Sequence, residues 1–419
     1  MAGLSILQIV HDHPHWTSGG TEHVAKDLCD ALNARQGVEA HLLCAATSLQ
    51  RNRTAAMDVL GADSVTWVGA YDRFMMSRLD ARTWAPQLRR TLAAIKPDVV
   101  HFHSLDRLGI ETLAVVRDAL PQARIVVTLH DYQLICANDG LMLTTTEGAR
   151  CGVASPDRCR RCFPAQSAER FALRRAYLMA NLAHVDTFIA PSRFLRDKFV
   201  AWGLEPQRIL VVRNATAETE NRASPTLAQP EADPSRRRNR FAFFGAIASH
   251  KGVFVLLDAA KRLASQQVDV TLSIHGPLNR GGADLVARFN AEVAAAWPVA
   301  THFGPYDRAD APGLIQQADW VIAPSIWWEN APLVVLEAQR ARRPVICSAI
   351  GGLAEMVRNG IDGLHVPPGD PGALAETMRS ATDPELWLRL SGAISEPRDL
   401  ASFATAHLEI YGSLLEKAA

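Results

Sequence analysis

The sequence predicts an α/β fold in two domains, each built on a parallel β-sheet that helices cover on both faces. The chain has 419 residues, which is more than one ordinary hydrophobic core organises. Short apolar runs alternate with longer helical patterns along it, as they do in parallel sheets. A polar stretch at residues 218–240 contains three prolines and interrupts this alternation, which then restarts. Such a break is typical of an interdomain linker or a long surface loop.

The first domain is predicted to span residues 1–217, and its apolar runs define its strands. Strands are expected at Leu4–Val10, Ala40–Ala45, Asp98–Phe102, Ile125–Leu129 and Thr187–Ile189. Helices are expected between them, for example at Glu22–Ala34 and Leu108–Ala119. This β-then-α order implies parallel strands joined by helical crossovers.

The second domain is predicted to span residues 241–395 and repeats the same rhythm. Strands are expected at Phe241–Phe244, Val270–His275, Trp320–Ile322, Val345–Cys347 and Leu364–Val366, with helices such as Phe254–Ala264 and Leu333–Arg342 between them. Residues 396–419 form a predicted C-terminal helix that packs back on the first domain. Open parallel sheets bind ligands beyond the carboxyl ends of their strands, so motifs directly after strands are the candidates for function.

Composition and charge exclude several classes of protein. Hydrophobic residues make up 48% and charged residues 21% of the chain, as in globular proteins. Lys+Arg and Asp+Glu both number 44, so no net charge attracts nucleic acid, and no nucleic-acid partner is expected. No apolar run reaches the roughly 18–20 residues that span a bilayer. The start of the chain lacks the basic region and cleavage site of a signal peptide, so a cytoplasmic protein is predicted.

Two loops after strands carry candidate phosphate-binding residues. Gly19 and Gly20 precede Thr21, an expected N-cap, and glycines before a helix N-terminus let the backbone approach a phosphate or sugar. The alternative is an ordinary Gly-Gly turn before a capped helix. Lys251 follows the strand at Phe241–Phe244 and stands just before a helix, where it can neutralise a diphosphate. The alternative for Lys251 is a solvated loop lysine.

A third loop contains the segment WWENAPLVVLE, with Glu329 and Glu337 at a spacing of eight residues. Pro332 suits the first turn of a helix, which places Glu329 before that helix and Glu337 inside it. Carboxylates accept hydroxyl hydrogens well, so the two glutamates are predicted to bind the diols of sugar or ribose. The alternatives are an ion pair between Glu337 and Arg340 and a dipole contact for Glu329.

The segment SAIGG places Gly351 and Gly352 after another expected strand. It is a further candidate for close approach to a ligand, and its alternative is a tight turn.

Four of the seven cysteines gather in one loop, residues 136–162, and the other three read as small core residues. They are Cys136, Cys151, Cys159 and Cys162, and the last two form a C-x2-C pair. The spacing permits one four-thiolate structural zinc site. The alternatives are four reduced thiols, or disulfides under oxidising conditions.

The order of these motifs resembles the family-4 retaining glycosyltransferases, whose GT-B fold consists of two Rossmann-like parallel-sheet domains facing a central cleft. The similarity runs from Ile6 to about Leu374 and is strongest over Ala318–Asp370, where Glu329 and Glu337 match the family's E-x7-E signature. Further matching segments are Gly19-Gly20, VVHFHS at Val99–Ser104, TLHDY at Thr128–Tyr132, APSRF at Ala190–Phe194, and FFGAIASHKG, which ends in Lys251-Gly252. The cysteine loop looks like the feature of a subgroup.

The resemblance implies a role for each candidate residue. Lys251 would contact the donor diphosphate, Glu337 the ribose hydroxyls, and Glu329 the transferred sugar or its phosphate surroundings. Other donor contacts are implied for Gly19, Gly20, Asn330, Ala331, Pro332, Leu333, Gly351 and Gly352. His103 matches the family's histidine near the reacting carbon, and His130 is a second catalytic candidate. The N-terminal domain would bind the acceptor.

The function that the resemblance implies is retaining, metal-independent transfer of a hexose from a UDP- or GDP-sugar. The implied acceptor is a glycan or a lipid-linked glycan of cell-surface polysaccharide synthesis. No cofactor is expected for catalysis. Mixed basic and apolar stretches at Arg73–Lys96 and Arg158–Arg175 predict peripheral contact with the cytoplasmic face of the inner membrane, with solvated helix faces as the alternative.

Two other functions are open. GT-B-like folds also include sugar-nucleotide epimerases. A non-catalytic donor-binding protein is the second alternative, because Ala246 stands where the family often has an arginine.

Overall fold

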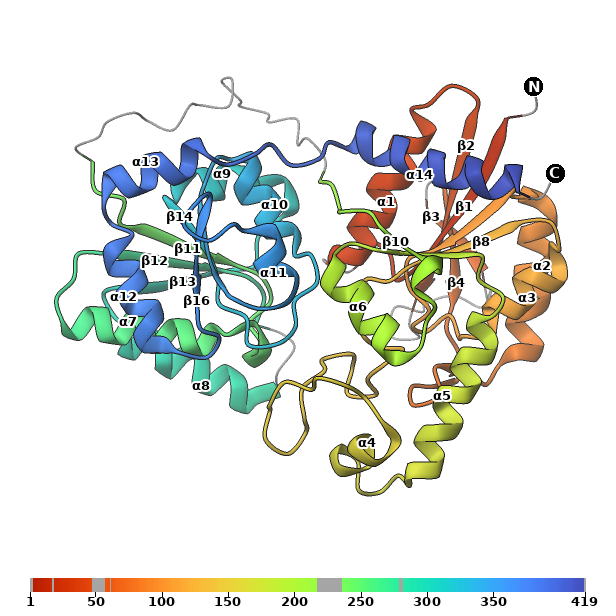
Figure 1. Cartoon of the computed structure of the whole chain (residues 1–419), viewed down its shortest axis with the longest axis horizontal. Coiled ribbons are helices and arrows are strands. Elements are labelled where there is room, and N and C mark those ends of the chain that lie inside the picture. Colours follow the sequence, from red (N-terminus) through yellow and green to blue (C-terminus); the bar gives the residue numbers. More distant parts are fainter. Residues whose placement is uncertain are drawn as a thin grey trace. The chain divides into compact units, whose positions relative to one another are not determined.

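The computed structural model describes residues 3–16, 19–46, 57–60, 62–216, 236–278 and 282–417. The chain forms two compact units (Figure 1). The first unit is Met1–Ala217 together with Arg398–Ala419, and the second is Glu218–Pro397. The two parallel-sheet α/β units confirm the predicted fold class. That they face a common cleft stays a prediction.

The first unit contains an eight-stranded sheet in the order β10-β9-β8-β7-β1-β2-β4-β3. Its strands are β1 (Leu4–His11), β2 (Val38–Ala46), β3 (Met57–Leu60), β4 (Asp63–Trp67), β7 (Val99–Phe102), β8 (Arg124–Thr128), β9 (Thr187–Ala190) and β10 (Ile209–Val211). All neighbours pair in parallel except β3 with β4. The order reverses between β1 and β7, so the loops after these two strands are where an open sheet binds ligands.

The helices of the first unit are α1 (Gly20–Asn33), α2 (Ala81–Ile95), α3 (Thr112–Ala119), α4 (Pro156–Cys162), α5 (Ala168–Leu182), α6 (Arg193–Trp202) and α14 (Leu400–Glu416). A small hairpin, β5 (Tyr71–Asp72) and β6 (Ser77–Arg78), precedes α2. The last helix, α14, packs against α1, although almost the whole chain separates them (Figure 1). Residues from the C-terminus therefore complete the first unit.

The second unit contains a six-stranded parallel sheet in the order β13-β12-β11-β14-β15-β16. Its strands are β11 (Arg240–Phe244), β12 (Thr271–His275), β13 (Ala300–Gly304), β14 (Trp320–Ala323), β15 (Val345–Ser348) and β16 (Gly363–Val366). Its helices are α7 (Val253–Ser265), α8 (Gly282–Ala295), α9 (Ala311–Gln317), α10 (Leu333–Arg340), α11 (Gly351–Met356), α12 (Pro371–Ser380) and α13 (Pro384–Gly392). This is the doubly wound order, with its reversal between β11 and β14.

Burial explains why the central strands form. Every residue of β7, β14 and β15 is buried, as expected where helices cover both faces of a parallel sheet. The core of the second unit is rich in aliphatic side chains and includes the fully buried Trp320 and Trp387. The expected strands are present, whereas β3, β4, β10 and β13 were not anticipated. β3, β10 and β13 lie at sheet edges and β4 lies next to one, and all four are only three to five residues long.

The predicted linker at residues 218–240 lies partly outside the described residues, which resume at Arg236. The described part is not a surface linker. Arg238 is fully buried, and Arg240 is the first residue of β11. The sequence predicted exposed arginines here, because arginine is rarely buried without a partner.

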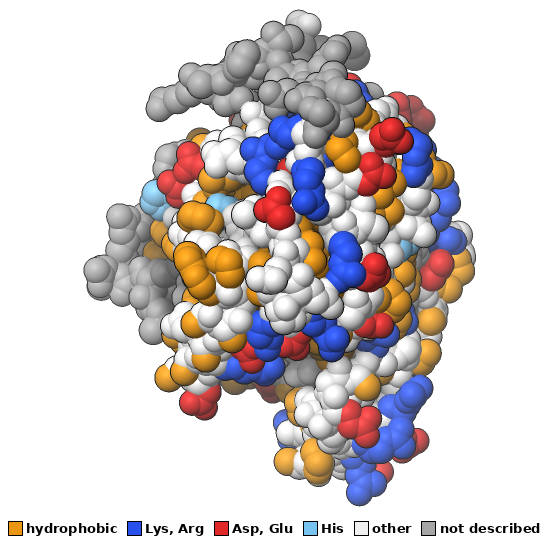
Figure 2. Space-filling model, turned by 90° about the vertical axis from the view of Figure 1, so that its left-hand side faces the viewer, with side chains coloured by type: hydrophobic (Ala, Val, Ile, Leu, Met, Phe, Trp, Pro, Cys, Tyr) orange, Lys and Arg blue, Asp and Glu red, His pale blue; other side chains and the backbone are white. Residues whose placement is uncertain are grey.

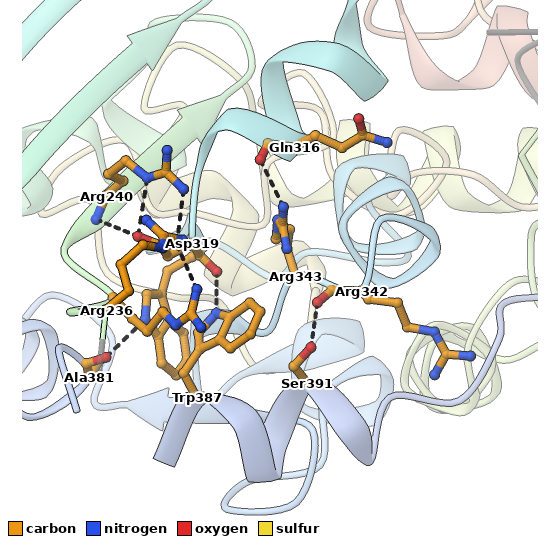
Figure 3. A network of polar contacts seen from close by, with 11 residues as sticks. Arg236, Arg240, Gln316, Asp319, Arg342, Arg343, Ala381, Trp387 and Ser391 are labelled. Carbon is orange, nitrogen blue, oxygen red and sulfur yellow. Dashed lines mark hydrogen bonds and ion pairs between the residues drawn. The ribbon is translucent and has the colours of Figure 1, made fainter. Parts of the chain in front are cut away.

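The partner of these arginines is Asp319, which is completely buried just before β14 (Figure 3). Its carboxylate accepts hydrogen bonds from Arg236 and from the Arg240 backbone N–H at 3.0 Å. Arg238 Nη1 lies 3.9 Å from the same carboxylate. The indole of Trp387 on α13 donates to the Asp319 carbonyl at 2.7 Å. The Asp319 carboxylate thus joins β14 to β11 at the amino ends of the strands, and the Asp319 backbone carbonyl holds α13 beside them.

On most of the face shown in Figure 2, Lys and Arg side chains are interspersed with Asp and Glu side chains. This distribution agrees with the equal totals of basic and acidic residues. No helix of the described residues is long and apolar enough to cross a bilayer.

Replacing the buried carboxylate tests this interaction. Asp319→Asn is expected to lower the free energy of unfolding of the second unit by about 3–5 kcal/mol, because it leaves the buried Arg238 guanidinium without its counter-charge. Urea denaturation followed by tryptophan fluorescence measures the change. The control is Asp269→Asn, whose carboxylate forms an exposed pair with Arg237 and is expected to matter by less than about 1 kcal/mol. Equal effects of the two substitutions would contradict the role of Asp319.

Candidate functional site

The first candidate site lies at the carboxyl edge of the second sheet, where the strand order reverses between β11 and β14. The chain leaves β11 through Gly245 and reaches a 3₁₀ turn, Ser249–Lys251, before α7 begins. It leaves β14 through Pro324 and Ser325 and reaches α10 at Leu333. The structure therefore brings the predicted residues Lys251 and Glu329 to the same edge.

Close backbone packing holds these two loops together. A β-carbon on Gly252 would lie 1.9 Å from the carbonyl oxygen of Pro324, and Gly252 has a φ of +75°. Only glycine fits both the space and the conformation. The backbone N–H of Ile326 also donates to the carbonyl of His250 at 2.9 Å. The positions of Lys251 and Glu329 are thus set by backbone contacts on either side of them.

Lys251 and Glu329 form a partly buried ion pair, with 2.6 Å between Nζ and Oε1. The Ser325 hydroxyl donates to the same oxygen at 2.8 Å. Burial alone would raise the pKa of Glu329, but the charge and hydrogen bond of Lys251, assisted by Ser325, hold that pKa below its ordinary value. Glu329 is therefore ionised at neutral pH and unsuited to act as a general acid. Lys251 Nζ also lies 5.1 Å from the ring centre of Trp327.

Gly351 and Gly352 pack against the glutamate loop. The Gly352 N–H donates to the Glu329 carbonyl at 2.7 Å. A β-carbon on Gly352 would lie only 1.4 Å from the Asn330 carbonyl oxygen, and one on Gly351 would lie 2.6 Å from that of Glu329. The structure thus gives these glycines a packing role beside the site, and a donor contact for them stays a prediction.

Glu337 lies within α10 and is half-buried. Burial and then the nearby charge of Glu337 raise the pKa of Tyr306, so the two side chains are neighbours. The helix begins at Leu333, as predicted, with Pro332 as its N-cap residue and no side-chain cap, and it ends at Arg340 rather than Arg342. No sequence signal identified Tyr306 or Ser325, because each follows a strand without a recognisable motif.

The second candidate site lies at the carboxyl edge of the first sheet. The N-cap of α1 is Gly19, not Thr21 as predicted. A β-carbon on Gly19 would lie 2.2 Å from Glu22 Oε2, so this carboxylate sits at the helix N-terminus. Glu22 also lies 3.5 Å from His11 Nε2. A phosphate at Gly19 and Gly20 would have to displace the Glu22 side chain.

His103 and His130 belong to a buried polar network that continues to the C-terminal helix. His103 Nδ1 lies 3.2 Å from His130 Nε2, and His103 Nε2 lies 2.7 Å from Gln8 Oε1. Gln8 donates to the Tyr411 hydroxyl at 3.3 Å. That hydroxyl lies 2.6 Å from His101 Nδ1.

Further contacts complete the network. His101 Nε2 contacts Thr128 Oγ1 at 2.7 Å, and the rings of His101 and His103 stack at 4.3 Å. His407 on α14 stacks on His101 from the other side at 5.6 Å.

These contacts are consistent with one set of proton positions. Because Gln8 donates to Tyr411 through its amide nitrogen, its oxygen faces His103 and requires a proton on His103 Nε2. His103 Nδ1 then accepts from His130, and the Tyr411 hydroxyl is free to donate to His101 Nδ1. Each imidazole is neutral in this arrangement.

The pKa values agree with neutral rings. Burial lowers the pKa of His101 and His103 well below the usual value, that of His130 to about 3 and that of His407 to about 4.

Burial separates the roles of the two predicted catalytic histidines. His103 is only 1% exposed, and both of its ring nitrogens have partners within the unit. His130 is more exposed and ends the network at the sheet edge. The adjacent Asp131 was not singled out by sequence, although burial raises its pKa, as at many functional sites. Gln8 could have been noticed as a polar residue inside an apolar strand.

The four predicted zinc ligands are free thiols in this structure and lie in one region of the first unit. Cys159 interacts electrostatically with Cys136, Cys151 and Cys162. Within the described residues, however, no three His, Cys, Asp or Glu side chains are arranged to hold a metal ion. Four-thiolate binding would require these side chains to reorient, and zinc stays a prediction.

Two family models match the chain, one for each unit. The model for Glycosyltransferase Family 4 matches residues 18–218, and the model for Glycosyl transferases group 1 matches residues 238–383. A curated relative, the D-inositol 3-phosphate glycosyltransferase of Salinispora arenicola (strain CNS-205), is 28% identical over 251 residues, which are 55% of this chain and 55% of the relative. The chain thus matches only about half the length of this relative.

Solved structures share the fold over nearly the whole chain. Sucrose-phosphate synthase from Thermosynechococcus elongatus is 18% identical with a TM-score of 0.71, covering 99% of this chain and 100% of that one. Anabaena Alr3699/HepE, in complex with UDP and glucose, is 18% identical with a TM-score of 0.68, covering 98% and 100%. At this identity the likeness establishes the fold alone.

Removing the Tyr411 hydroxyl tests the histidine network. ¹⁵N NMR of the wild-type protein is expected to show His101 and His103 as single neutral Nε2–H tautomers, without titration from pH 8 down to about pH 5, because burial lowers both pKa values. In Tyr411→Phe, His101 loses a donor and Gln8 loses an acceptor. Mixed tautomers and higher histidine pKa values are expected.

The matched control is Tyr177→Phe, which removes a hydroxyl bonded to Glu111 elsewhere in the first unit. It should leave the imidazole signals unchanged. Spectra of Tyr411→Phe that equal the wild type would show that α14 does not hold the histidines.

Elemental analysis tests the zinc prediction. Protein purified without chelator should contain about one zinc per chain, because four thiolates bind this metal strongly. Cys159→Ser with Cys162→Ser should abolish it, whereas Cys29→Ser, which changes a buried core thiol, should not. Less than about 0.2 zinc per wild-type chain would exclude the site.

Proposed function

Because one unit carries a family 4 glycosyltransferase domain and the other a group 1 glycosyl transferase domain, we propose that the protein is a retaining glycosyltransferase. Its donor is a nucleoside-diphosphate sugar bound by the second unit, and its acceptor is a glycan or lipid-linked glycan bound by the first. UDP-sugars are the first candidates, since the HepE structure holds UDP and glucose.

The observation that carries this proposal is the Lys251–Glu329 pair at the strand-order reversal of the second sheet. A lysine ammonium has three N–H donors and uses one on Glu329, so the others remain for phosphate oxygens. The adjacent N-terminus of α10 has no side-chain cap and offers backbone N–H groups and a positive dipole end. Together these groups stabilise the negative charge that develops on a departing diphosphate. No metal ion is required for this step.

Glu337 and Tyr306 are the proposed contacts for the ribose. Glu337 is half-buried, and burial with the Glu337 charge raises the pKa of the Tyr306 hydroxyl, which therefore remains a hydrogen-bond donor at neutral pH. A carboxylate that accepts from two ribose hydroxyls gains charge-assisted hydrogen bonds. Glu329 is proposed to orient Lys251 and to accept a hydroxyl of the transferred sugar.

In the first unit, His130 is the proposed contact for the reacting groups, and His103 positions it. A neutral His130 can accept or donate a hydrogen bond to a hydroxyl but brings no charge. The pKa of about 3 argues against an imidazolium near the anomeric carbon.

Peripheral membrane contact is proposed for the segment around α4 and α5. Val153 is 46% and Leu173 61% exposed, and four arginines beside them are exposed: Arg158, Arg160, Arg161 and Arg170. Mixed basic and apolar surfaces of this kind bind anionic lipid. The stretch Arg73–Lys96 is a weaker candidate, since α2 buries Trp84, Leu88 and Leu92. Flotation with anionic liposomes tests this membrane contact. If the protein shows no salt-sensitive binding to them, membrane contact is no longer part of the proposal.

A donor screen is the first experiment. Thermal shifts with UDP, GDP, ADP and their sugars report binding, because a ligand that binds only the folded state raises the melting temperature. Turnover is then measured as release of the nucleoside diphosphate. Interconversion of the donor sugar without transfer would indicate an epimerase. Donor binding with neither turnover nor slow hydrolysis of the donor would indicate a non-catalytic protein.

Lys251→Ala and Glu337→Ala are each expected to reduce turnover by about 100-fold or more while the fold persists. Lys251→Ala removes a charge that stabilises the leaving diphosphate, and Glu337→Ala removes a donor-orienting carboxylate. The matched controls are Lys261→Ala, which changes a half-buried, ion-paired lysine on α7, and Glu376→Ala, which changes an exposed glutamate on α12. Near-normal turnover in either site variant, with melting temperatures like those of the controls, would refute the site.

A further inference from the structure

A cavity of about 270 Å³ lies in the first unit beside the histidine edge. Its walls come from the β5–β6 hairpin, the loop after His130, and the segment that follows α4. The lining includes Phe74, Asp106, Gln133, Phe163 and Gln166. Asp106 and Gln133 stand three residues after His103 and His130 respectively, so the cavity opens from the same loops that carry the histidines.

Arg174 makes the walls of this cavity rigid. Its side chain is 3% exposed and donates to the carbonyl oxygens of Phe74 at 2.5 Å, Gln133 at 2.7 Å and Leu134 at 2.8 Å. One guanidinium therefore joins the hairpin to the loop after His130. Because its donors are directed at backbone carbonyls, it fixes the shape of the cavity without offering a charge to a ligand. A preformed cavity avoids the entropic cost of ordering its walls on binding.

Aromatic rings and an amide without a protein partner define the chemistry of the cavity. Phe74 and Phe163 both contact the buried Phe171, at ring distances of 5.1 and 6.0 Å. The buried oxygen Oε1 of Gln166 has no hydrogen-bond partner among the described residues. A buried amide oxygen of this kind costs free energy until a donor reaches it. That oxygen is closed to water in this conformation, so a ligand hydroxyl can supply the donor once the Gln166 side chain turns toward the cavity that it lines.

The charged groups at the cavity disfavour an anion. Asp106 accepts from the Tyr71 hydroxyl at 3.1 Å and remains a carboxylate with further lone pairs. Asp139 forms an exposed pair with Arg73 at 2.7 Å across the lining. The lining thus holds two carboxylates and two arginines. Arg73 is paired with Asp139, and Arg174 donates to backbone carbonyls. The cavity therefore offers phosphate no excess of positive charge, whereas carboxylates and amides together accept hydroxyl hydrogens.

We propose that this cavity binds an uncharged pyranose ring, namely the sugar of the acceptor that carries the attacking hydroxyl. The ring would place its C–H face on Phe74 or Phe163 and its hydroxyl groups on Gln166, Gln133 and Asp106. A volume of about 270 Å³ admits one sugar unit rather than a whole glycan chain. This inference rests on the proposed glycosyltransferase function, because it assigns the acceptor to the histidine edge.

Met76 provides a local probe of the cavity, since it is 3% exposed and forms part of the lining. The full-length protein is labelled at its methionine methyl groups, and the Met76 signal is assigned with Met76→Leu. Methyl glycosides of glucose, mannose, galactose and N-acetylglucosamine are titrated one by one. At least one is expected to shift the Met76 signal in a saturable manner, whereas inorganic phosphate is not.

Two substitutions test the contacts. Gln166→Ala and Phe74→Leu should each weaken binding of the active glycoside by about threefold to tenfold, since each removes one hydrogen bond or one aromatic face. The matched control is Gln207→Ala, a solvent-exposed glutamine that bonds to Glu205 outside the cavity. It should leave binding unchanged. The proposal is overturned if no glycoside shifts Met76, if phosphate shifts it instead, or if both site variants bind like the control.

The donor experiments and the glycoside titrations can contradict the two proposals separately. If Lys251→Ala abolishes turnover and no glycoside reaches Met76, the glycosyltransferase assignment stands and the acceptor cavity is wrong. If a glycoside binds at Met76 but no nucleoside-diphosphate sugar binds or turns over, the sugar cavity stands and the proposed transfer is wrong.

Discussion

Close backbone packing at the carboxyl edge of the second sheet is the constraint on which its candidate site depends. Gly252 contacts Pro324, and Gly352 contacts Asn330, at distances that admit no β-carbon. These contacts hold the loops after β11, β14 and β15 in one position before any ligand arrives. Because the loops are fixed in this way, Lys251 and Glu329 form their ion pair without any reorganisation of the backbone.

The sequence predicted the fold, and it placed Lys251 and Glu329 in loops that follow strands of one sheet, because both follow from periodicity. Lys251 and Glu329 each follow an apolar run, and parallel strands bring such positions to one edge. Their direct pairing was not predictable, since it depends on backbone approach between loops 78 residues apart. Arg238 was misassigned to a linker, because only the buried Asp319 shows why a charge is tolerated there. The cavity near Gln166 is lined by segments that are far apart in the sequence, and it has no local signature.

The structure leaves most of the predicted site residues as candidates, but their burial changes the roles that individual residues can have. His103 was the stronger catalytic candidate by resemblance, yet it lies beneath His130 and uses both ring nitrogens inside the unit. Glu329 was predicted to accept hydroxyl groups of a sugar, and in the structure it is also the counter-ion of Lys251. In both cases a residue that the motif assigned to a ligand has its polar atoms bonded to other protein groups. A motif thus locates a site, whereas hydrogen-bond partners distinguish its working groups from their supports.

The return of α14 to the first unit has a consequence for synthesis on the ribosome. The second unit is one continuous stretch, Glu218–Pro397, and can fold as soon as it emerges. The first unit cannot, because Gln8 and His101 bond to the hydroxyl of Tyr411, which is made only after the whole second unit. At about 5–20 residues per second, the nascent first unit waits roughly 10–40 s while the second is translated. During that interval its central strands carry buried polar groups without their partners, so the unit encoded first is completed last.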